Sequence, residues 1–368
     1  MSKGKYIRGA SRRSLLQQFG AAAIGISFAG GLSACGRQGG GSERVVNFYN
    51  WDTYIGPTTL EDFQAAAGAR VEMSLFATND ELFARLRAGN PGFDVIVPSN
   101  EFVTRMSQAQ MLMELDHSKI PNMANLLPEF QDAAFDPGRR YSMPYTWLVL
   151  GIAYRKDRMP AGFVPNSWRY LFDSPQFSQR LALLSESADL IRLCAKYKGH
   201  SVNGIPDAML AEIEQMLIRQ KPHIKAFHED DGQDLLAAGE VDIVLEYNGD
   251  IAQLMAGPGG EAFDFVVPTE GTLINSDCLC IPTGAPHVDD AHAFINYLLD
   301  AEAGKKITEE IQYPTPNAAV AALMGPEYQS NRVIFPPAEV MAVSEYGAFE
   351  GDDKSRQYEE IFTRINAA

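Results

Sequence analysis

Hydrophobic runs and amphipathic stretches alternate from residue 45 to the end of the chain. Short apolar runs bounded by turn residues predict buried strands, and apolar residues that recur every three or four positions predict helices. We expect strands at 45–49, 71–76, 93–98, 181–184, 241–247, 262–267 and 278–281. We expect helices at 58–67, 80–88, 188–197, 208–217, 291–299 and 304–312. Strands that alternate with helices predict an α/β fold with mostly parallel sheets flanked by helices.

Two segments are predicted to connect two lobes. Residues 141–154 lead into a continuous apolar run, and residues 270–281 place a turn before a strand. A chain that crosses twice makes each lobe discontinuous and leaves a cleft that can close about a hinge. The first lobe is expected at 45–146 plus about 277–325, and the second at about 147–276 plus about 326–368.

The first 34 residues predict an export signal. They contain five Lys or Arg and no acidic residue, and a Gly/Ala-rich apolar stretch follows the basic start. Arg12-Arg13 is typical of a twin-arginine signal, and Leu32-Ser33-Ala34-Cys35 resembles a lipobox, which would be cleaved before Cys35 and lipidated on its sulfur. Ordinary cleavage near the same point, with Cys35 unmodified, is the alternative. Residues 35–44 are rich in Gly and are predicted to be a flexible tether.

Charge narrows the class of partner. The chain has 31 basic and 47 acidic residues, and removing the five basic residues of the signal leaves 26 against 47, a net charge of −21. Such acidity argues against binding to nucleic acid or to anionic lipid, and it favours cationic small molecules. After residue 35 no apolar run approaches the ~20 residues of a spanning helix. We therefore expect membrane contact only through a lipid anchor, and a monomer.

Sequence motifs of catalysis and cofactor binding are not found. The chain has no Gly-x-Ser-x-Gly elbow, no phosphate-binding loop and no His-Glu-x-x-His. Cys194, Cys278 and Cys280 make no zinc framework and are expected to be buried free thiols. We expect a protein that is not an enzyme and that holds no metal or cofactor.

Acidic and aromatic side chains recur where predicted strands end. The strand at 45–49 runs into a loop with Trp51, Asp52 and Tyr54, and other acids and rings follow later strands. In an open α/β sheet, ligands bind outside the carboxyl ends of the strands. Each residue also has a structural alternative: acids in a first helical turn complement the helix dipole, Asp250 can cap a helix, and the tyrosines can be packing residues.

Six strings of the sequence suggest a family: Phe48-Tyr49-Asn50-Trp51, Asp94-Val95-Ile96-Val97-Pro98-Ser99, Tyr141-Ser142-Met143-Pro144-Tyr145, Asn248-Gly249-Asp250, Asp277-x-Leu279-x-Ile281-Pro282 and Tyr313-Pro314-Thr315-Pro316-Asn317. With them the chain resembles, from about Val45 onward, the spermidine/putrescine-binding proteins of bacterial ABC transporters. The resemblance implies a two-lobed binding protein with two interlobe crossings, of the type II kind. It also implies a polyamine ligand and a partner in the membrane subunits of an ABC importer.

The resemblance further implies a ligand site made of Trp51, Tyr54, Ser99, Glu186, Asp189, Tyr247, Asp250, Asp277 and Tyr313. In the family pattern, Glu186 and Asp189 match a pair of acids that binds one end of the polyamine. Asp277 matches the acid that holds an amine near the second crossing. Tyr247 stands where the family usually has Trp.

Five positions depart from the spermidine-type pattern. Glu101 replaces Tyr, Asn275 replaces Trp and Glu229 replaces Ser, while Asp52-Thr53 replaces the usual order of hydroxyl then acid. These exchanges remove aromatic surface and add acids to the expected site. The ligand is therefore expected to be a polyamine or, alternatively, another cationic amine or guanidino solute. A sensor or an enzyme on the same scaffold is the least expected function.

Overall fold

The computed structural model describes residues 44–229 and 231–368. The predicted export signal at 1–34, Cys35 and nearly all of the tether lie outside the described residues. Within the described ranges, no helix combines the length and the apolar character that a membrane crossing requires.

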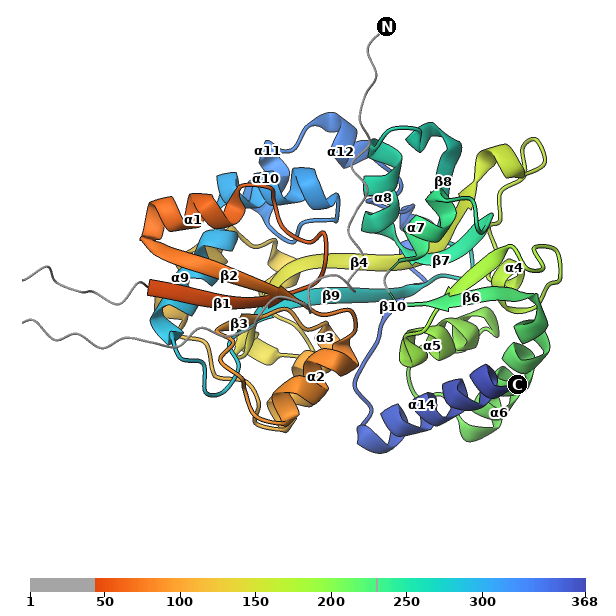
Figure 1. Cartoon of the computed structure of the whole chain (residues 1–368), viewed down its shortest axis with the longest axis horizontal. Coiled ribbons are helices and arrows are strands. Elements are labelled where there is room, and N and C mark those ends of the chain that lie inside the picture. The colour runs from red at the N-terminus through yellow and green to blue at the C-terminus, as the bar shows by residue number, and fades with distance from the viewer. Residues whose placement is uncertain (1–43, 230) are drawn as a thin grey trace, which may run out of the picture. The chain divides into compact units, whose positions relative to one another are not determined.

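The strands join into one ten-stranded sheet in the order β2-β1-β3-β9-β4-β7-β5-β6, with β10 added to β9 and β8 added to β4 (Figure 1). The strands are β1 (Arg44–Asn50), β2 (Ala69–Leu75), β3 (Val95–Ile96), β4 (Ser142–Arg155), β5 (Leu181–Leu184), β6 (Ile224–His228), β7 (Ile243–Tyr247), β8 (Phe263–Val266), β9 (Leu273–Cys280) and β10 (Glu345–Tyr346). Strand β1 pairs in parallel with β2 and β3, and β5 pairs in parallel with β6 and β7.

Helices cover both sides of this sheet (Figure 1). They are α1 (Thr59–Ala67), α2 (Asn79–Arg87), α3 (Asn100–Gln108), α4 (Arg169–Phe172), α5 (Ser187–Tyr197), α6 (Asp207–Gln220), α7 (Gly232–Ala237), α8 (Asn248–Ala256), α9 (Val288–Leu298), α10 (Ala301–Ile311), α11 (Ala318–Leu323), α12 (Pro326–Ser330), α13 (Ala338–Met341) and α14 (Asp352–Ala367). Short 3-10 helices occur in the connections.

Alternation along the strands explains why both faces are covered. In β1, Phe48 packs into a core with α1, α9 and α10, while the next residue, Tyr49, packs into a core with α2 and α3. In β4, Ile152 faces a core with α5, α6 and α14, and Ala153 faces one with α7 and α8. Successive side chains of a strand point to opposite faces, so each half of the sheet has two apolar cores.

Strands β4 and β9 run antiparallel through the middle and connect the two halves. We call the half with β1, β2 and β3 the first lobe and the half with β5, β6 and β7 the second lobe. The predicted α/β fold with two lobes and two crossing strands is confirmed. The predicted lobe boundaries stay a prediction. The three cysteines Cys194, Cys278 and Cys280 are buried and free, as expected.

Two local predictions were wrong, and both concern the region of the site. Strand β9 begins at Leu273, five residues before the predicted start, because Asn275, Ser276 and Asp277 are polar but buried and pair with β4. The alternative in which Asp250 caps a helix also fails. Helix α8 begins at Asn248, its N-cap is Tyr247, and Asp250 lies inside the first turn.

Candidate functional site

A cavity lies where the two crossing strands meet the ends of both lobes. Its empty volume, which includes some open solvent, is about 670 Å³. All nine residues implied by the family resemblance line it, together with Asp52, Glu101 and Asn275. Their participation in ligand binding stays a prediction. The other lining residues, which sequence reasoning missed, are Asn79, Phe102, Leu148 and Ala188.

The loop after β1 forms an aromatic wall. The indole nitrogen of Trp51 donates to the Val97 carbonyl at 2.9 Å, and its ring centroid lies 4.3 Å from that of Phe76. Tyr54 is 4% exposed, and its ring meets that of Tyr313 edge-on with 5.0 Å between centroids. These contacts fix both rings of the loop at the cavity before any ligand arrives.

Asp277 stands at the centre of a buried hydrogen-bond network. It is 5% exposed, and it accepts a bond from the Ser99 hydroxyl at 2.7 Å and one from the Tyr54 hydroxyl at 2.8 Å. Asn79 holds Ser99 in turn, because its side chain bonds both the Ser99 hydroxyl and the Ser99 backbone N–H at 3.0 Å. Burial raises the pKa of Asp277 to about 6, and these two hydroxyl bonds oppose that rise.

Asp250 lies beside Asp277 and repeats its pattern. The Tyr313 hydroxyl donates to Asp250 at 2.7 Å, and burial followed by the nearby charge of Asp277 raises the pKa of Asp250. Gly249 makes this approach possible, because a Cβ at that position would stand 2.1 Å from the Tyr313 ring. We call Asp250 and Asp277 the tyrosine end of the cavity.

Glu186 and Asp189 form a second acidic group of the cavity, which we call the arginine end for the nearby Arg192. Asp189 accepts hydrogen bonds from the Tyr247 hydroxyl and from the Asn275 amide, both at 3.2 Å. Burial raises the pKa of Asp189 to about 6, while Arg192 opposes the rise and Glu101 adds to it. Burial and the charge of Asp189 raise the pKa of Glu186 well above its usual range.

One atom of this end lacks a partner. Glu186 is the N-cap residue of α5 and makes no capping bond through its side chain. Its Oε1 atom is buried and has no hydrogen-bond partner among the described residues. A buried carboxylate oxygen without a partner is unfavourable, and a donor or a cation in the cavity would relieve it.

The cavity is strongly acidic. No Lys, Arg or His is among the described residues that line it. Six of the lining residues carry carboxylates, namely Asp52, Glu101, Glu186, Asp189, Asp250 and Asp277. The rings of Trp51, Tyr54, Tyr247 and Tyr313 line the same cavity. Such a surface suits a ligand with several positive charges separated by apolar segments. Within the described residues no group of His, Cys, Asp and Glu is arranged to hold a metal ion.

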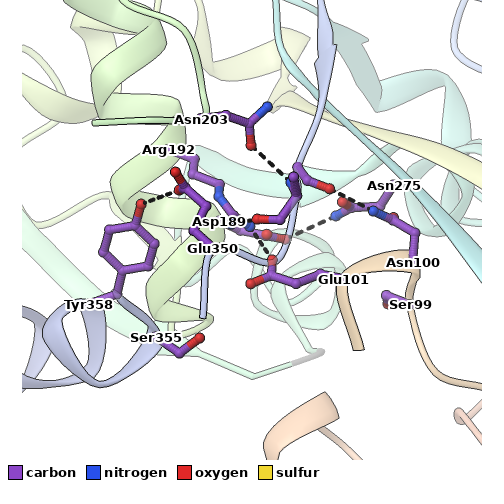
Figure 2. A network of polar contacts seen from close by, with 12 residues as sticks. Ser99, Asn100, Glu101, Asp189, Arg192, Asn203, Asn275, Glu350, Ser355 and Tyr358 are labelled. Atoms are coloured by element: carbon purple, nitrogen blue, oxygen red, sulfur yellow. Dashed lines mark hydrogen bonds and ion pairs between the residues drawn. The ribbon is translucent and has the colours of Figure 1, made fainter. Parts of the chain in front are cut away.

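Glu101 is paired with a basic residue that lies just outside the cavity lining. Its carboxylate forms an ion pair with Arg192 of α5, so the pair joins α3 of the first lobe to the second lobe (Figure 2). The side chain of Arg192 is 1% exposed, and it also donates to the Ala348 carbonyl at 2.6 Å. Sequence reasoning placed Arg192 in a helix but gave no signal of this contact.

Two of the less certain predicted residues are not at the cavity. Thr53 is exposed in a turn with φ 49°, where its N–H bonds Asp52. Glu229 follows β6, which is the outermost strand of the second lobe, and it lines surface depressions with Phe227. Glu229 shares one of these depressions with Asp52, but it is not among the residues that line the cavity.

Comparison with known proteins gives one family and close relatives. Residues 58–336 match the model of the family described as bacterial extracellular solute-binding protein. The spermidine/putrescine-binding periplasmic protein of Escherichia coli K12 is 31% identical over 88% of this chain and 92% of its own length. The putrescine-binding periplasmic protein SpuD of Pseudomonas aeruginosa is 30% identical over 89% of this chain and 92% of its own.

A solved structure has the same fold. The spermidine/putrescine ABC transporter substrate-binding protein of Streptococcus pneumoniae superposes with a TM-score of 0.75 and 27% identity. The match covers 88% of this chain and 99% of that one. The likeness therefore extends over both lobes and both crossing strands.

Proposed function

This chain belongs to the family of bacterial extracellular solute-binding proteins, and we propose that it captures a polyamine between its two lobes. The observation that carries the proposal is the pairing of four carboxylates at two ends of a cavity that is also lined by aromatic rings and whose described lining has no basic residue. The relatives named for spermidine and putrescine support the same ligand class.

Each feature of the cavity matches a part of a polyamine. Ammonium groups bind at the tyrosine end and at the arginine end, where Glu186 supplies an oxygen that has no partner of its own. The rings of Trp51 and Tyr247 cover the methylenes and add cation–π attraction of ~0.5–2 kcal/mol each. Charged hydrogen bonds of ~1.5–3 kcal/mol each bring the total to the ~8 kcal/mol of a micromolar dissociation constant.

Closure of the lobes follows from where these residues lie. Trp51, Tyr54 and Ser99 belong to the first lobe, whereas Glu186 and Asp189 belong to the second. A ligand that contacts both sets binds the closed state better than the open one, and so it shifts the population toward closure. The membrane subunits of an ABC importer then recognise the closed monomer and receive the polyamine.

The N-terminal segment supplies the location. We propose that the twin-arginine signal exports the chain to the periplasm or another extracytoplasmic space, and that lipid on Cys35 anchors it through the tether. We also propose that the first lobe comprises 45–146 plus about 277–325, and the second about 147–276 plus about 326–368. Membrane fractionation of cells that express the native chain and a Cys35→Ser variant tests the anchor: only the native chain should sediment with membranes. Equal partition of the two would refute lipidation.

A second candidate ligand is another cationic amine or a guanidino solute. Asn275 and Tyr247 provide less ring surface than the tryptophans of the spermidine-type pattern. Carboxylates bind a planar guanidinium in a bidentate manner, so the same acids suit such a group. No catalytic step is proposed for this protein.

Calorimetric titration of the mature chain tests the proposal. Putrescine, cadaverine, spermidine, spermine, agmatine and arginine are titrated separately, and at least one alkyl polyamine should bind with a micromolar or lower dissociation constant. Preferential binding of agmatine or arginine would favour the second candidate. If none of the six binds, the proposed ligand class is wrong.

A further inference from the structure

The ion pair between Glu101 and Arg192 lies directly behind the arginine end of the cavity. Glu101 lines the cavity and is 13% exposed, whereas Arg192 is 1% exposed and lies one helical turn after Asp189 on α5. Figure 2 shows the guanidinium between the Glu101 and Asp189 side chains. Charges buried in this way interact much more strongly than charges in water.

Arg192 is held in place from behind. Its guanidinium donates to the Ala348 carbonyl and lies 5.7 Å from the centre of the Tyr358 ring. Asn203 in turn holds the Ala348 backbone N–H at 2.9 Å. These contacts prevent the guanidinium from swinging out of the cavity wall when a ligand arrives.

The two ends therefore differ in their charge balance. At the tyrosine end, Asp250 and Asp277 are surrounded by hydroxyl groups, which carry no charge. At the arginine end, three carboxylates share one resident cation, and the net charge is −2 when all are ionised. Without Arg192 the same end would carry −3 and would attract a ligand with one more positive charge.

We propose that Arg192 is a specificity-determining residue. It acts as a resident cation that neutralises Glu101 and leaves each end of the cavity with two uncompensated carboxylates, so that diamines are selected over triamines and tetra-amines. This inference rests on the proposed function. Beyond that function, it specifies which polyamines are preferred and which residue sets the preference.

Charge substitutions at the pair test the inference. The quantity measured is the ratio of the dissociation constants of putrescine and spermidine, by calorimetry, in native protein and in Arg192→Gln, Glu101→Gln and the double variant. Arg192→Gln should shift the ratio toward spermidine by roughly tenfold, because Glu101 loses its counter-ion beside the ligand. Glu101→Gln should shift it the opposite way. The double variant restores the charge balance and should return the ratio to within about threefold of native.

Asp352→Asn is the matched control. Asp352 pairs with Arg105 at 2.9 Å and so also joins α3 to the second lobe, but it is 73% exposed and does not line the cavity. Its variant should leave the ratio unchanged. A shift equal to that of Arg192→Gln would mean that lobe closure, and not local charge, sets the preference, and would overturn the inference.

Other outcomes of these measurements would also refute the inference. An unchanged ratio in Arg192→Gln, or a double variant that keeps the full shift of the single one, would refute the role of Arg192 while leaving polyamine binding intact. Thermal melting of each variant shows whether it is folded. If Arg192→Gln is not folded, Glu101→Gln decides, because an unchanged ratio or a shift toward spermidine in that variant would refute the inference. Failure of the native protein to bind any amine would instead refute the proposed function.

Discussion

The tyrosine end and the arginine end of the cavity hold their carboxylates by different means. Asp250 and Asp277 accept short hydrogen bonds from neutral hydroxyl groups, and both are at most 9% exposed. Glu186 and Asp189 are more exposed, and they lie close to a full ion pair. Hydroxyl donors stabilise a carboxylate without cancelling its charge, whereas a nearby guanidinium changes how much cation the end attracts.

This difference suggests a division of roles. Hydroxyl donors already hold both carboxylates of the tyrosine end before the ligand arrives, so this end offers one geometry to one ammonium group. The arginine end has a carboxylate oxygen without a partner, and its net charge depends on Arg192. It therefore selects the charge of the rest of the ligand. Substitutions at each end and the pH dependence of binding distinguish unequal ends from equal ones.

The largest effect is expected at Asp277. We expect Asp277→Asn to weaken polyamine binding about a hundredfold or more, because removing one partner of a buried charged pair costs roughly 2–5 kcal/mol. Isothermal titration calorimetry at pH 7.5 measures the change. The control is Asp52→Asn, an exposed acid at the same cavity, which should lose less than about fivefold. Equal losses of affinity in both variants would show that Asp277 contributes no more to binding than an exposed acid does.

Glu186→Gln is expected to weaken binding about ten- to fiftyfold, less than Asp277→Asn because Asp189 still faces the ammonium group. The same change should make the ligand-free protein more stable. Folding raises the pKa of Glu186, so the folded state loses stability as pH rises from about 4.5 through that raised pKa, and Gln has no such loss. We expect the melting temperature of the free variant to exceed that of the native chain by a few degrees at pH 8. The difference should shrink at pH 4.5, and a lower melting temperature at pH 8 would contradict the assignment.

The pH dependence compares the two ends directly. Asp189 and Asp277 both have pKa values raised to about 6, so below pH 6 each must lose a proton before it can face an ammonium group. Affinity should therefore fall as pH drops, by about tenfold per unit for each such carboxylate once pH is well below its pKa. Titrations at pH 6 in buffers of different ionisation enthalpy should show proton release on binding. Release that persists unchanged in a variant with both Asp250→Asn and Asp277→Asn would mean that only the arginine end titrates.

The smallest effect is expected from tyrosine hydroxyl groups. Tyr247→Phe removes the 3.2 Å bond to Asp189 but keeps the ring, and we expect a loss of about two- to fivefold in affinity. Tyr313→Phe removes the shorter 2.7 Å bond to Asp250 and should lose more than Tyr247→Phe. Both dissociation constants are measured with the same ligand. The reverse order would show that the arginine end depends more on hydroxyl donors.

Much of the site was predictable because the carboxyl ends of strands meet at one place. Glu186, Asp189, Tyr247 and Asp250 each follow a strand of the second lobe, and the structure brings them to one cavity. Glu229 was expected from the family pattern and not from a strand end. It follows the edge strand β6 and lines surface depressions outside the cavity, and the order of strands in the sheet cannot be read from the order along the chain.

Arg192 could not have been found from sequence patterns. Its position within a predicted amphipathic helix gives no sign of a partner, and Glu101 lies 91 residues away in the other lobe. Such a contact depends on how two lobes meet, which local periodicity does not describe. Polar residues 275–277 were missed as strand for a related reason: they are buried by tertiary contacts, and their pattern alone resembles a loop.

The position of Asp277 on β9 also bears on the order of events during capture. Because β9 pairs with β4 at the crossing between lobes, we expect Asp277 to lie near the pivot of closure and to change its surroundings little when the lobes open. We expect a polyamine to meet the tyrosine end first and the second-lobe acids only as the cleft shuts. Its residence time would then be set by how often the lobes part, and a ligand too short to reach the second lobe would leave before closure.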